Sequence, residues 1–352
     1  MDETDDIALD MASRLFAQLE ESGAARALES RALASADWAR IEELGFPLAL
    51  VPEELGGIGM EPVHALGLLR LAGEHALALP LADTMLANAV LASCGIKPAS
   101  GVSTLALARP GELLPGLTQR GTGWHLAGKA FQVPWGGGAQ TIAVVAQAPD
   151  GLRVVSISEP RVAQQGVNLA DEPRDDLAFD LMVSEAAVAP LPDAISYDVL
   201  LARGAIIRSV LIAGALERVL TMCTRYALDR VQFGKPIGRF QAIQQNLAVM
   251  AGHVVAARAA ADLAAEAWSA PDMLVVGSAK IRAGEAAGAV AALAHQVHGA
   301  IGFAREYALH LFTRRLWSWR DEFGNEAFWA KRVGAMAQVA GPDGYWPLVT
   351  AT

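Results

Sequence analysis

The segment Asp229–Gln244, DRVQFGKPIGRFQAIQ, interrupts long Ala- and Leu-rich stretches with side chains that can bind an anion and an aromatic ring. Arg230 offers a planar guanidinium that can donate to two phosphate oxygens at once. Gln232 adds an amide, and Phe233 adds an apolar wall. The Gly-Lys-Pro that follows is typical of a turn before a new helix. The residue types alone leave two interpretations open: an anion-binding site, or a helix junction closed by a surface Arg and a core Phe.

Other chemistries find less support. His295 and His298 lie three residues apart, but no clustered Cys, Asp or third His accompanies them, so we expect packing or helix-end roles and no metal. The segment WGGGAQ lacks the Lys-Ser/Thr of a phosphate-binding P-loop, and no nucleophile elbow is present. Cys94 and Cys223 lie in apolar helical contexts, which favours buried thiols in a reducing compartment.

The elements that would position these residues fall into three segments. Residues 1–98 show apolar residues at helical spacing, residues 99–192 contain short β-like runs separated by Gly, Pro and Asp, and residues 193–352 return to long helical patterns. The stretch GEAAGAVAALAHQVHGAIG is apolar nearly all round, so we expect it to be buried in a large bundle or between subunits. We therefore predict a mostly α chain with a middle β-domain.

The composition limits the classes of partner that this chain could bind. The chain has 352 residues, is 53% hydrophobic and carries a net charge of −10, which argues against nucleic acid or an anionic membrane as a partner. The acidic N-terminus does not resemble a signal peptide, and we read no uninterrupted apolar run of about 18 residues. We expect a soluble, cytoplasmic protein that does not bind a membrane.

Five motifs in order resemble the acyl-CoA dehydrogenase family across essentially the whole chain: ELGFPLALVPEELGGIGM, GWHLAGKAFQVP, YALDRVQFGKPIGRFQAIQQNLAVM, QVHGAIGFAREY and LWSWRDEFGNEAF. The resemblance implies an N-terminal helical domain, a β-barrel-like domain and a C-terminal four-helix bundle. It also implies FAD bound across a subunit interface and the α,β-desaturation of an acyl-CoA thioester, with an electron-transfer protein as acceptor.

The resemblance also implies which residues contact FAD. Arg230 would reach the pyrophosphate of a flavin held mainly by a neighbouring subunit. The full set that it places at FAD is Arg230, Gln232, Phe233, Ile237, Phe240, Gln241, Gln296, Val297, Gly299 and Ala300. Ala300 stands where a second Gly is usual in the family.

The chain departs from the family at the catalytic base. An ungapped alignment places Phe323 where the family has its Glu, and Gly204 and Ala205 occupy the family's other base location. Glu322 is a weak candidate for a displaced base; beside Asp321, it has an ordinary interpretation as a solvated side chain.

The middle β-domain departs as well. Ala108 and Arg109 replace residues that cradle the flavin ring and the acyl-CoA carbonyl in the family. In the hairpin FQVPWGGGAQ, Phe131 or Trp135 could cover a ring, or both could belong to the core of the barrel.

These departures remove this chain's own site but keep the residues that reach a partner's flavin. Bacterial sterol breakdown uses heteromeric dehydrogenases in which a subunit that lacks the base pairs with a subunit that carries it. This chain is thus similar to the base-lacking subunits. The alternatives are a self-sufficient homotetramer with a displaced base and a non-catalytic scaffold for acyl-CoA or protein binding.

Overall fold

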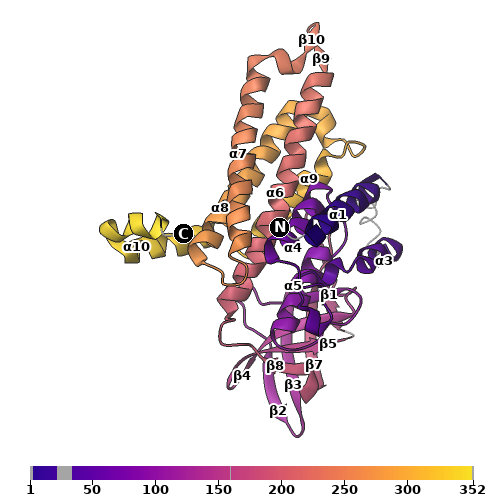
Figure 1. Cartoon of the computed structure of the whole chain (residues 1–352), viewed down its shortest axis with the longest axis vertical. Coiled ribbons are helices and arrows are strands. Elements are labelled where there is room, and N and C mark those ends of the chain that lie inside the picture. The colour runs from indigo at the N-terminus through magenta and orange to yellow at the C-terminus, as the bar shows by residue number, and fades with distance from the viewer. Residues whose placement is uncertain (1–2, 22–33, 159, 351–352) are drawn as a thin grey trace. The chain divides into compact units, whose positions relative to one another are not determined.

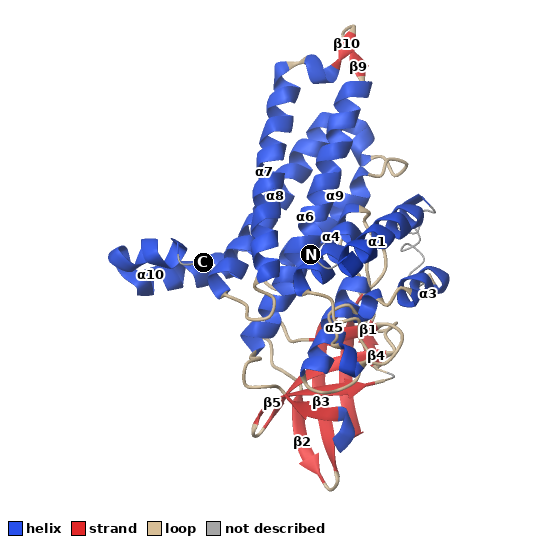
Figure 2. Ribbon diagram, viewed as in Figure 1, coloured by secondary structure: helices blue, strands red, loops and turns tan. Residues whose placement is uncertain are grey.

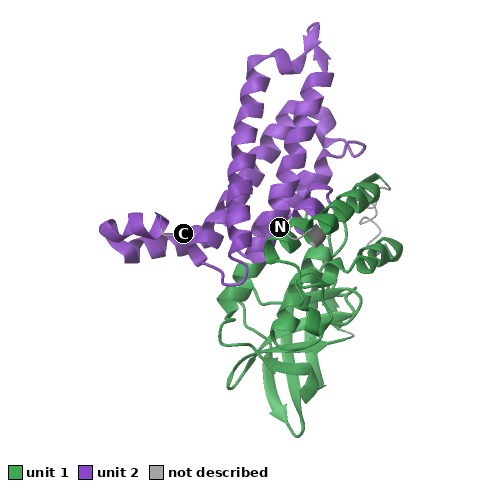
Figure 3. Ribbon diagram, in the orientation of Figure 1, with its two compact units in different colours: residues 1–68, 78–203 green, residues 69–77, 204–352 purple. Residues whose placement is uncertain are grey.

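The computed structural model describes residues 3–21, 34–158 and 160–350. The chain divides into two compact units, one of residues 1–68 and 78–203 and the other of residues 69–77 and 204–352 (Figures 1 and 3). The predicted fold class, mostly helical with a central sheet domain, is confirmed (Figure 2). The division into three domains, at 98 and 192, is finer than these two units and stays a prediction.

The helices of the first unit pack around one buried element. α5 is buried along its whole length except its last residue because Leu, Met, Val and Ala alternate with only short polar side chains. Thr84 on α5 donates its hydroxyl proton to the Ser103 carbonyl (3.0 Å), which fixes the helix to strand β1. The elements of this part are α1 (Glu3–Glu21), α3 (Ser35–Glu43), the first half of α4 (Pro62–Glu74), α5 (Leu81–Ser93) and β1 (Ser103–Ala106).

An eight-stranded sheet follows, in the order β6-β7-β3-β2-β4-β5-β8 with β1 paired to β4. β4 is buried at almost every position, as its run of Ile, Val and Ala requires. A bulge between Ala130 and Val133 shifts the β3–β7 register, and Gln132 at the bulge has φ 52°. The strands are β2 (Gly116–Arg120), β3 (Gly123–Pro134), β4 (Thr141–Ala148), β5 (Gly151–Ile157), β6 (Arg161–Gln164), β7 (Arg174–Ser184) and β8 (Val188–Pro190).

The second unit is a bundle of long helices with a short hairpin at one end (Figure 2). α8 is buried along most of its length, so the expectation from its all-round apolar sequence is confirmed for burial. The elements are most of α6 (Tyr197–Asp229), β9 (Val231–Gln232), β10 (Lys235–Pro236), α7 (Gln241–Glu266), α8 (Met273–His298), the 3₁₀ turn η6 (Gly299–Phe303), α9 (Leu309–Asp321) and α10 (Glu326–Thr350).

Two helices, α6 and α7, have the length and composition of a membrane span, contrary to our expectation from the sequence. The apolar stretch of α6 is 94% buried within the fold, as in a core helix. That of α7 is only 28% buried and exposes Val249, Val255 and Leu263. Such an apolar surface on a single chain is the kind that another protein chain covers.

The turn between α9 and α10 is fixed by a buried cation. The Lys280 ammonium on α8 has no exposed surface and donates to the carbonyls of Arg320 (2.6 Å) and Gly324 (2.9 Å). Trp329 donates its indole N–H to the Phe323 carbonyl (3.0 Å). Burial lowers the pKa of Lys280 to about 7, although the nearby Glu326, Glu322 and Asp321 act to raise it. The backbone on both sides of Phe323 is therefore held in one conformation.

This burial predicts a pH dependence of stability. The pKa of Lys280 is lower in the folded chain than its ordinary value of 10.5, so the unfolded chain binds the proton more tightly between about pH 7 and 10.5. The free energy of unfolding should therefore increase as pH rises through that window, because of this group. We expect Lys280→Met to remove that component, measured by urea unfolding from pH 7.5 to 9.5.

Lys331→Met is the matched control, because Lys331 is exposed on α10. It should keep the wild-type slope of stability against pH. Lys280→Met should also lower stability by about 1–3 kcal/mol, since two buried carbonyls lose their donor. An identical slope in Lys280→Met and the wild type would contradict the assignment.

Candidate functional site

The hairpin β9–β10 lies at the end of the helical bundle, where α6 ends (Figure 1). Gln232 pairs with Lys235 and Val231 pairs with Pro236. The two residues between the strands, Phe233 and Gly234, have φ 51° and 77°, the positive angles of a tight hairpin turn. The turn leaves Phe233 92% exposed.

A cleft of about 360 Å³ lies beside this hairpin. It brings together two segments far apart in sequence, the hairpin region and the C-terminal end of α8. Of the ten residues predicted to contact FAD, eight line it: Arg230, Gln232, Phe233, Ile237, Phe240, Gln296, Val297 and Gly299. Gln241, at the start of α7, and Ala300, in η6, are not among the lining residues.

The polar side chains of the cleft are available to a ligand. Within the described part of the chain, the Arg230 guanidinium and the amides of Gln232 and Gln296 have no hydrogen-bond or ion-pair partner. Phe240 forms a rigid apolar wall: it meets Phe233 edge to face (6.1 Å between centroids) and lies under the Lys235 ammonium (4.4 Å). One guanidinium, two amides and aromatic walls can bind an anion attached to a flat ring.

Three further residues line the cleft that the sequence analysis did not place there. Tyr226 lies one helical turn before Arg230 on α6, and its ring stacks on His298 (4.4 Å between centroids). The sequence did contain a signal for Tyr226, because residues four apart share a helix face and Tyr226 lies four residues before Arg230. His298 lies between Val297 and Gly299, but its apolar context predicted packing alone. Ile243 also lines the cleft.

The two positions where the family places a base lie against each other in the second unit. A Cβ atom built on Gly204 would come within 2.1 Å of the Phe323 ring, so the ring occupies the space of any side chain there. Phe323 itself has φ 54°, in the left-handed region that non-Gly residues rarely adopt. A ring therefore stands where a carboxylate would be needed.

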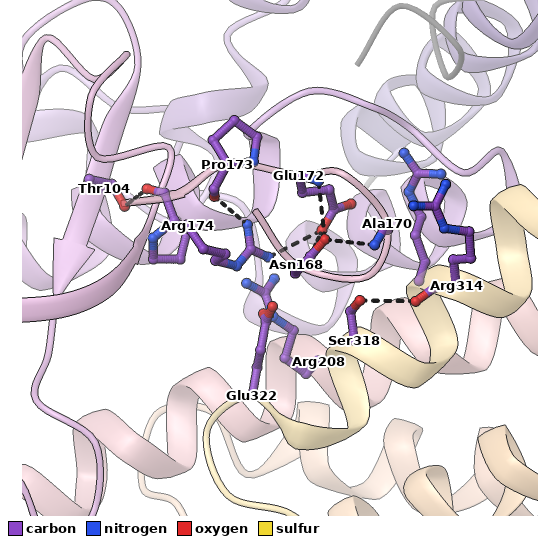
Figure 4. Close-up of polar contacts among 12 residues, drawn as sticks. Thr104, Asn168, Ala170, Glu172, Pro173, Arg174, Arg208, Arg314, Ser318 and Glu322 are labelled. Atoms are coloured by element: carbon purple, nitrogen blue, oxygen red, sulfur yellow. Dashed lines mark hydrogen bonds and ion pairs between the residues drawn. The ribbon is translucent and has the colours of Figure 1, made fainter. Parts of the chain in front are cut away.

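Glu322 is not a solvated neighbour of Asp321, so that interpretation is wrong. Its carboxylate accepts a hydrogen bond from Nε of Arg208 on α6 at 2.6 Å, and the Arg208 side chain is 2% exposed (Figure 4). The Arg208 guanidinium also lies 5.5 Å from the centre of the Phe323 ring. Sequence reasoning missed this pair because Arg208 and Glu322 are 114 residues apart.

In the first unit, the loop that resembles the flavin cradle uses its polar groups internally. The Tyr197 hydroxyl donates to the Ala108 carbonyl (2.8 Å). Arg109 pairs with the Glu112 carboxylate and donates to Gln132 Oε1 (2.7 Å). Of the two hairpin aromatics, Trp135 is buried and Phe131 is 39% exposed.

The residues present therefore fit one end of FAD and not the other. The cleft has a free guanidinium and free amides, which suit the diphosphate and the adenine side. The Ala108–Arg109 loop has no comparable free donors in its described contacts, so it does not fit as a cradle for the flavin ring.

Known proteins resemble this chain in sequence and in fold. The family model "Acyl-CoA dehydrogenase, C-terminal domain" matches residues 199–327. Acyl-CoA dehydrogenase IpdE2 of Mycobacterium tuberculosis is 30% identical over 281 residues, covering 78% of this chain and 77% of that protein. 3-Sulfinopropanoyl-CoA desulfinase of Paraburkholderia xenovorans is 31% identical over 301 residues, covering 76% and 74%.

Among solved structures, the ChsE4–ChsE5 complex of Mycobacterium tuberculosis contains a chain with the same fold, at a TM-score of 0.87 and 24% identity, covering 97% of this chain and 99% of that one. FAD is the cofactor that the family match supports. The extent of the match to IpdE2 decides the family: this chain belongs to the acyl-CoA dehydrogenases.

Proposed function

We propose that this chain is a subunit of an FAD-dependent acyl-CoA dehydrogenase and completes the FAD site of a related, base-bearing partner chain. The observation that carries the proposal is the contrast within one chain. Among the described residues Arg230 has no partner and lies on an open cleft, whereas the Phe323 ring fills the space beside Gly204, where the resemblance places the base.

The exposed hairpin supports a role outside the chain. Phe233 is 92% exposed at the tip of a tight turn, beside Leu228 at 65% and Val231 at 53%, and an apolar surface of this kind is one that another protein chain covers. The cleft opens next to this tip. A flavin held mainly by the partner would place its diphosphate against Arg230.

The closed base position supports the absence of acid–base chemistry in this chain. Glu322 is paired with Arg208, whose buried guanidinium donates to its carboxylate at 2.6 Å. A general base for this reaction works best when its pKa is raised toward the working pH in an apolar site. The partner chain would therefore supply the base.

In the mechanism, bound FAD supplies the hydride acceptor for the substrate's β carbon. This chain's own residues bind and orient. Arg230 would hold and neutralise the diphosphate, and the Gln232 and Gln296 amides would offer further donors to the cofactor. Phe233 and Phe240 cover apolar surface and exclude water. The α proton passes to a group that this chain does not contribute.

The substrate class is an acyl-CoA thioester, with an electron-transfer protein as the acceptor of the reducing equivalents. The ChsE4–ChsE5 structure is a complex of two chains, which supports a heteromeric assembly here. A bulky, ring-bearing acyl group follows only by analogy with the heteromeric enzymes of sterol breakdown.

Two other functions remain to be separated from this one by the ratio of flavin to chain. One-half in a two-protein complex supports the proposal. One flavin per chain in a homomer supports a self-sufficient dehydrogenase, and none supports a non-catalytic scaffold.

Arg230→Ala should lower the flavin content of the assembled complex and leave its assembly unchanged. Loss of a charge-assisted, partly desolvated contact costs about 2–3 kcal/mol, or roughly 30- to 150-fold in affinity. Flavin retention is measured by absorbance after dialysis. Arg225→Ala is the matched control, because Arg225 lies on the same helix end and pairs only loosely with Asp229 (3.7 Å). Equal retention in both variants would refute the assignment.

Purified alone, the chain should bind FAD weakly or not at all, because its own loop at Ala108–Arg109 offers no free donors to the ring. The measurement is the flavin absorbance of the isolated chain after gel filtration with excess FAD. A yellow homotetramer with one flavin per chain would show that the partner is not needed.

Glu322→Gln should leave the dehydrogenase rate of the complex within a few-fold of wild type, since a true base contributes about 10²–10⁴ in rate. The rate is followed with an acyl-CoA and an artificial electron acceptor, at matched flavin content. Asp321→Asn serves as the control for changes at the exposed end of α9. A hundredfold loss in Glu322→Gln alone, with flavin still bound, would assign the acid–base step to this chain.

A further inference from the structure

Two buried histidines lie beneath the cleft, on the last turn of α8. His298 is 4% exposed and His295 is 8% exposed. Each contacts residues of other elements around the cleft. His298 stacks on Tyr226 of α6, a wall of the cleft, and lies against Tyr307, which follows η6. His295 lies between Phe303 of η6 (4.3 Å between centroids) and Trp317 of α9 (5.9 Å), both nearly parallel to it.

The hydrogen bonds of His298 fit a neutral ring that carries its proton on Nδ1, and burial outweighs the opposite effect of the Ala294 carbonyl on the pKa of this ring. The Ala294 carbonyl can only accept, so Nδ1–H donates to it (2.8 Å). Nε2 then accepts from the Tyr307 hydroxyl (2.9 Å). A second proton on Nε2 would require the Tyr307 hydroxyl to reverse its role from donor to acceptor.

The contacts of His295 also suit a neutral ring. Its Nε2 lies 3.1 Å from the Thr313 hydroxyl. Its Nδ1 is buried without a hydrogen-bond partner among the described residues and faces Gly302, where a Cβ would lie 3.2 Å away. A proton added there would have no acceptor.

The titratable groups that face this pair offer no compensating negative charge. They are Cys223 and Tyr226 on α6, Arg230 on the cleft, Tyr307, and His310 on α9. Within the described contacts, no carboxylate acts on either ring. Burial lowers the pKa of both histidines below 6.5, and the neighbouring histidines lower that of His295 further.

We infer that His295 and His298 are positioning residues of the cleft, which in their neutral form hold η6 and Tyr226 in place and on protonation release them. Because their pKa values are lower in the folded chain, the unfolded arrangement binds more protons below about pH 6.5. The structure around η6 therefore loses stability as pH falls through that region. The consequence for the cofactor rests on the proposed function of the cleft, but the release of the turn does not.

Amide hydrogen exchange of the full chain tests this directly. Between pH 7.5 and 5.5, corrected for intrinsic exchange, protection of residues 294–307 should fall by about tenfold or more. The double variant His295→Phe/His298→Phe keeps the ring stacks and cannot be protonated, so its protection should change less than about twofold. His125→Gln, on the sheet of the other unit, should behave as wild type. Unchanged protection in the wild type, or an equal fall in the double variant, would overturn the inference.

Titration of the histidine ring signals by nuclear magnetic resonance provides a test that needs no folded double variant. The single variants His295→Gln and His298→Gln assign the two signals, which should both titrate below pH 6.5; titration at or above 6.5 would overturn the inference. In the flavin-loaded complex, the wild type should release flavin faster at pH 5.5 than at 7.5. If the turn responds to pH and flavin release does not, the inference holds and the proposed role of the cleft fails.

Discussion

The ammonium of Lys280 bonds two backbone carbonyls in a place that water does not reach, and the geometry of the α9–α10 turn depends on it. The two carbonyls lie on either side of residue 323, so the amine sets the direction in which that side chain points. The turn has the rigidity that an active site requires, because a catalytic group must be held within a fraction of an ångström. Here the same rigidity holds a phenyl ring against Gly204.

The two ends of the second unit differ in how their polar groups are used. At the hairpin end, one cation and two amides have no partner among the residues that the structure describes, which costs little in water and leaves them available to a ligand. At the α9–α10 end, Arg208 and Glu322 are paired. A buried pair of this kind contributes little net stability, yet removal of one partner leaves an uncompensated charge. The first end thus presents polar groups to the solvent, whereas the second satisfies them within the chain.

Much of this could be predicted from the sequence, and the limits have physical causes. The residues predicted to contact FAD follow local motifs, and local motifs determine hairpins and helix ends; eight of these ten residues line one cleft. Gln241, at the start of α7, and Ala300, in η6, do not line it, and which side chain of a helix start or a 3₁₀ turn faces a cleft is not given by the motif alone. The Arg208–Glu322 pair and the contact of Phe323 with Gly204 join positions more than a hundred residues apart, which no local pattern encodes. No local pattern marks Lys280 as buried, because the burial of its charge depends on how three helices pack together.

The packing of Phe323 on Gly204 couples two positions that lie far apart in the sequence. A Cβ atom at 204 would come within 2.1 Å of the ring, so a carboxylate at 204 requires a smaller residue at 323. A carboxylate introduced at 323 would in turn stand beside Glu322, which is already paired with Arg208. A side chain can therefore be introduced at 204 only together with a change at 323, and the two positions have to vary as a pair.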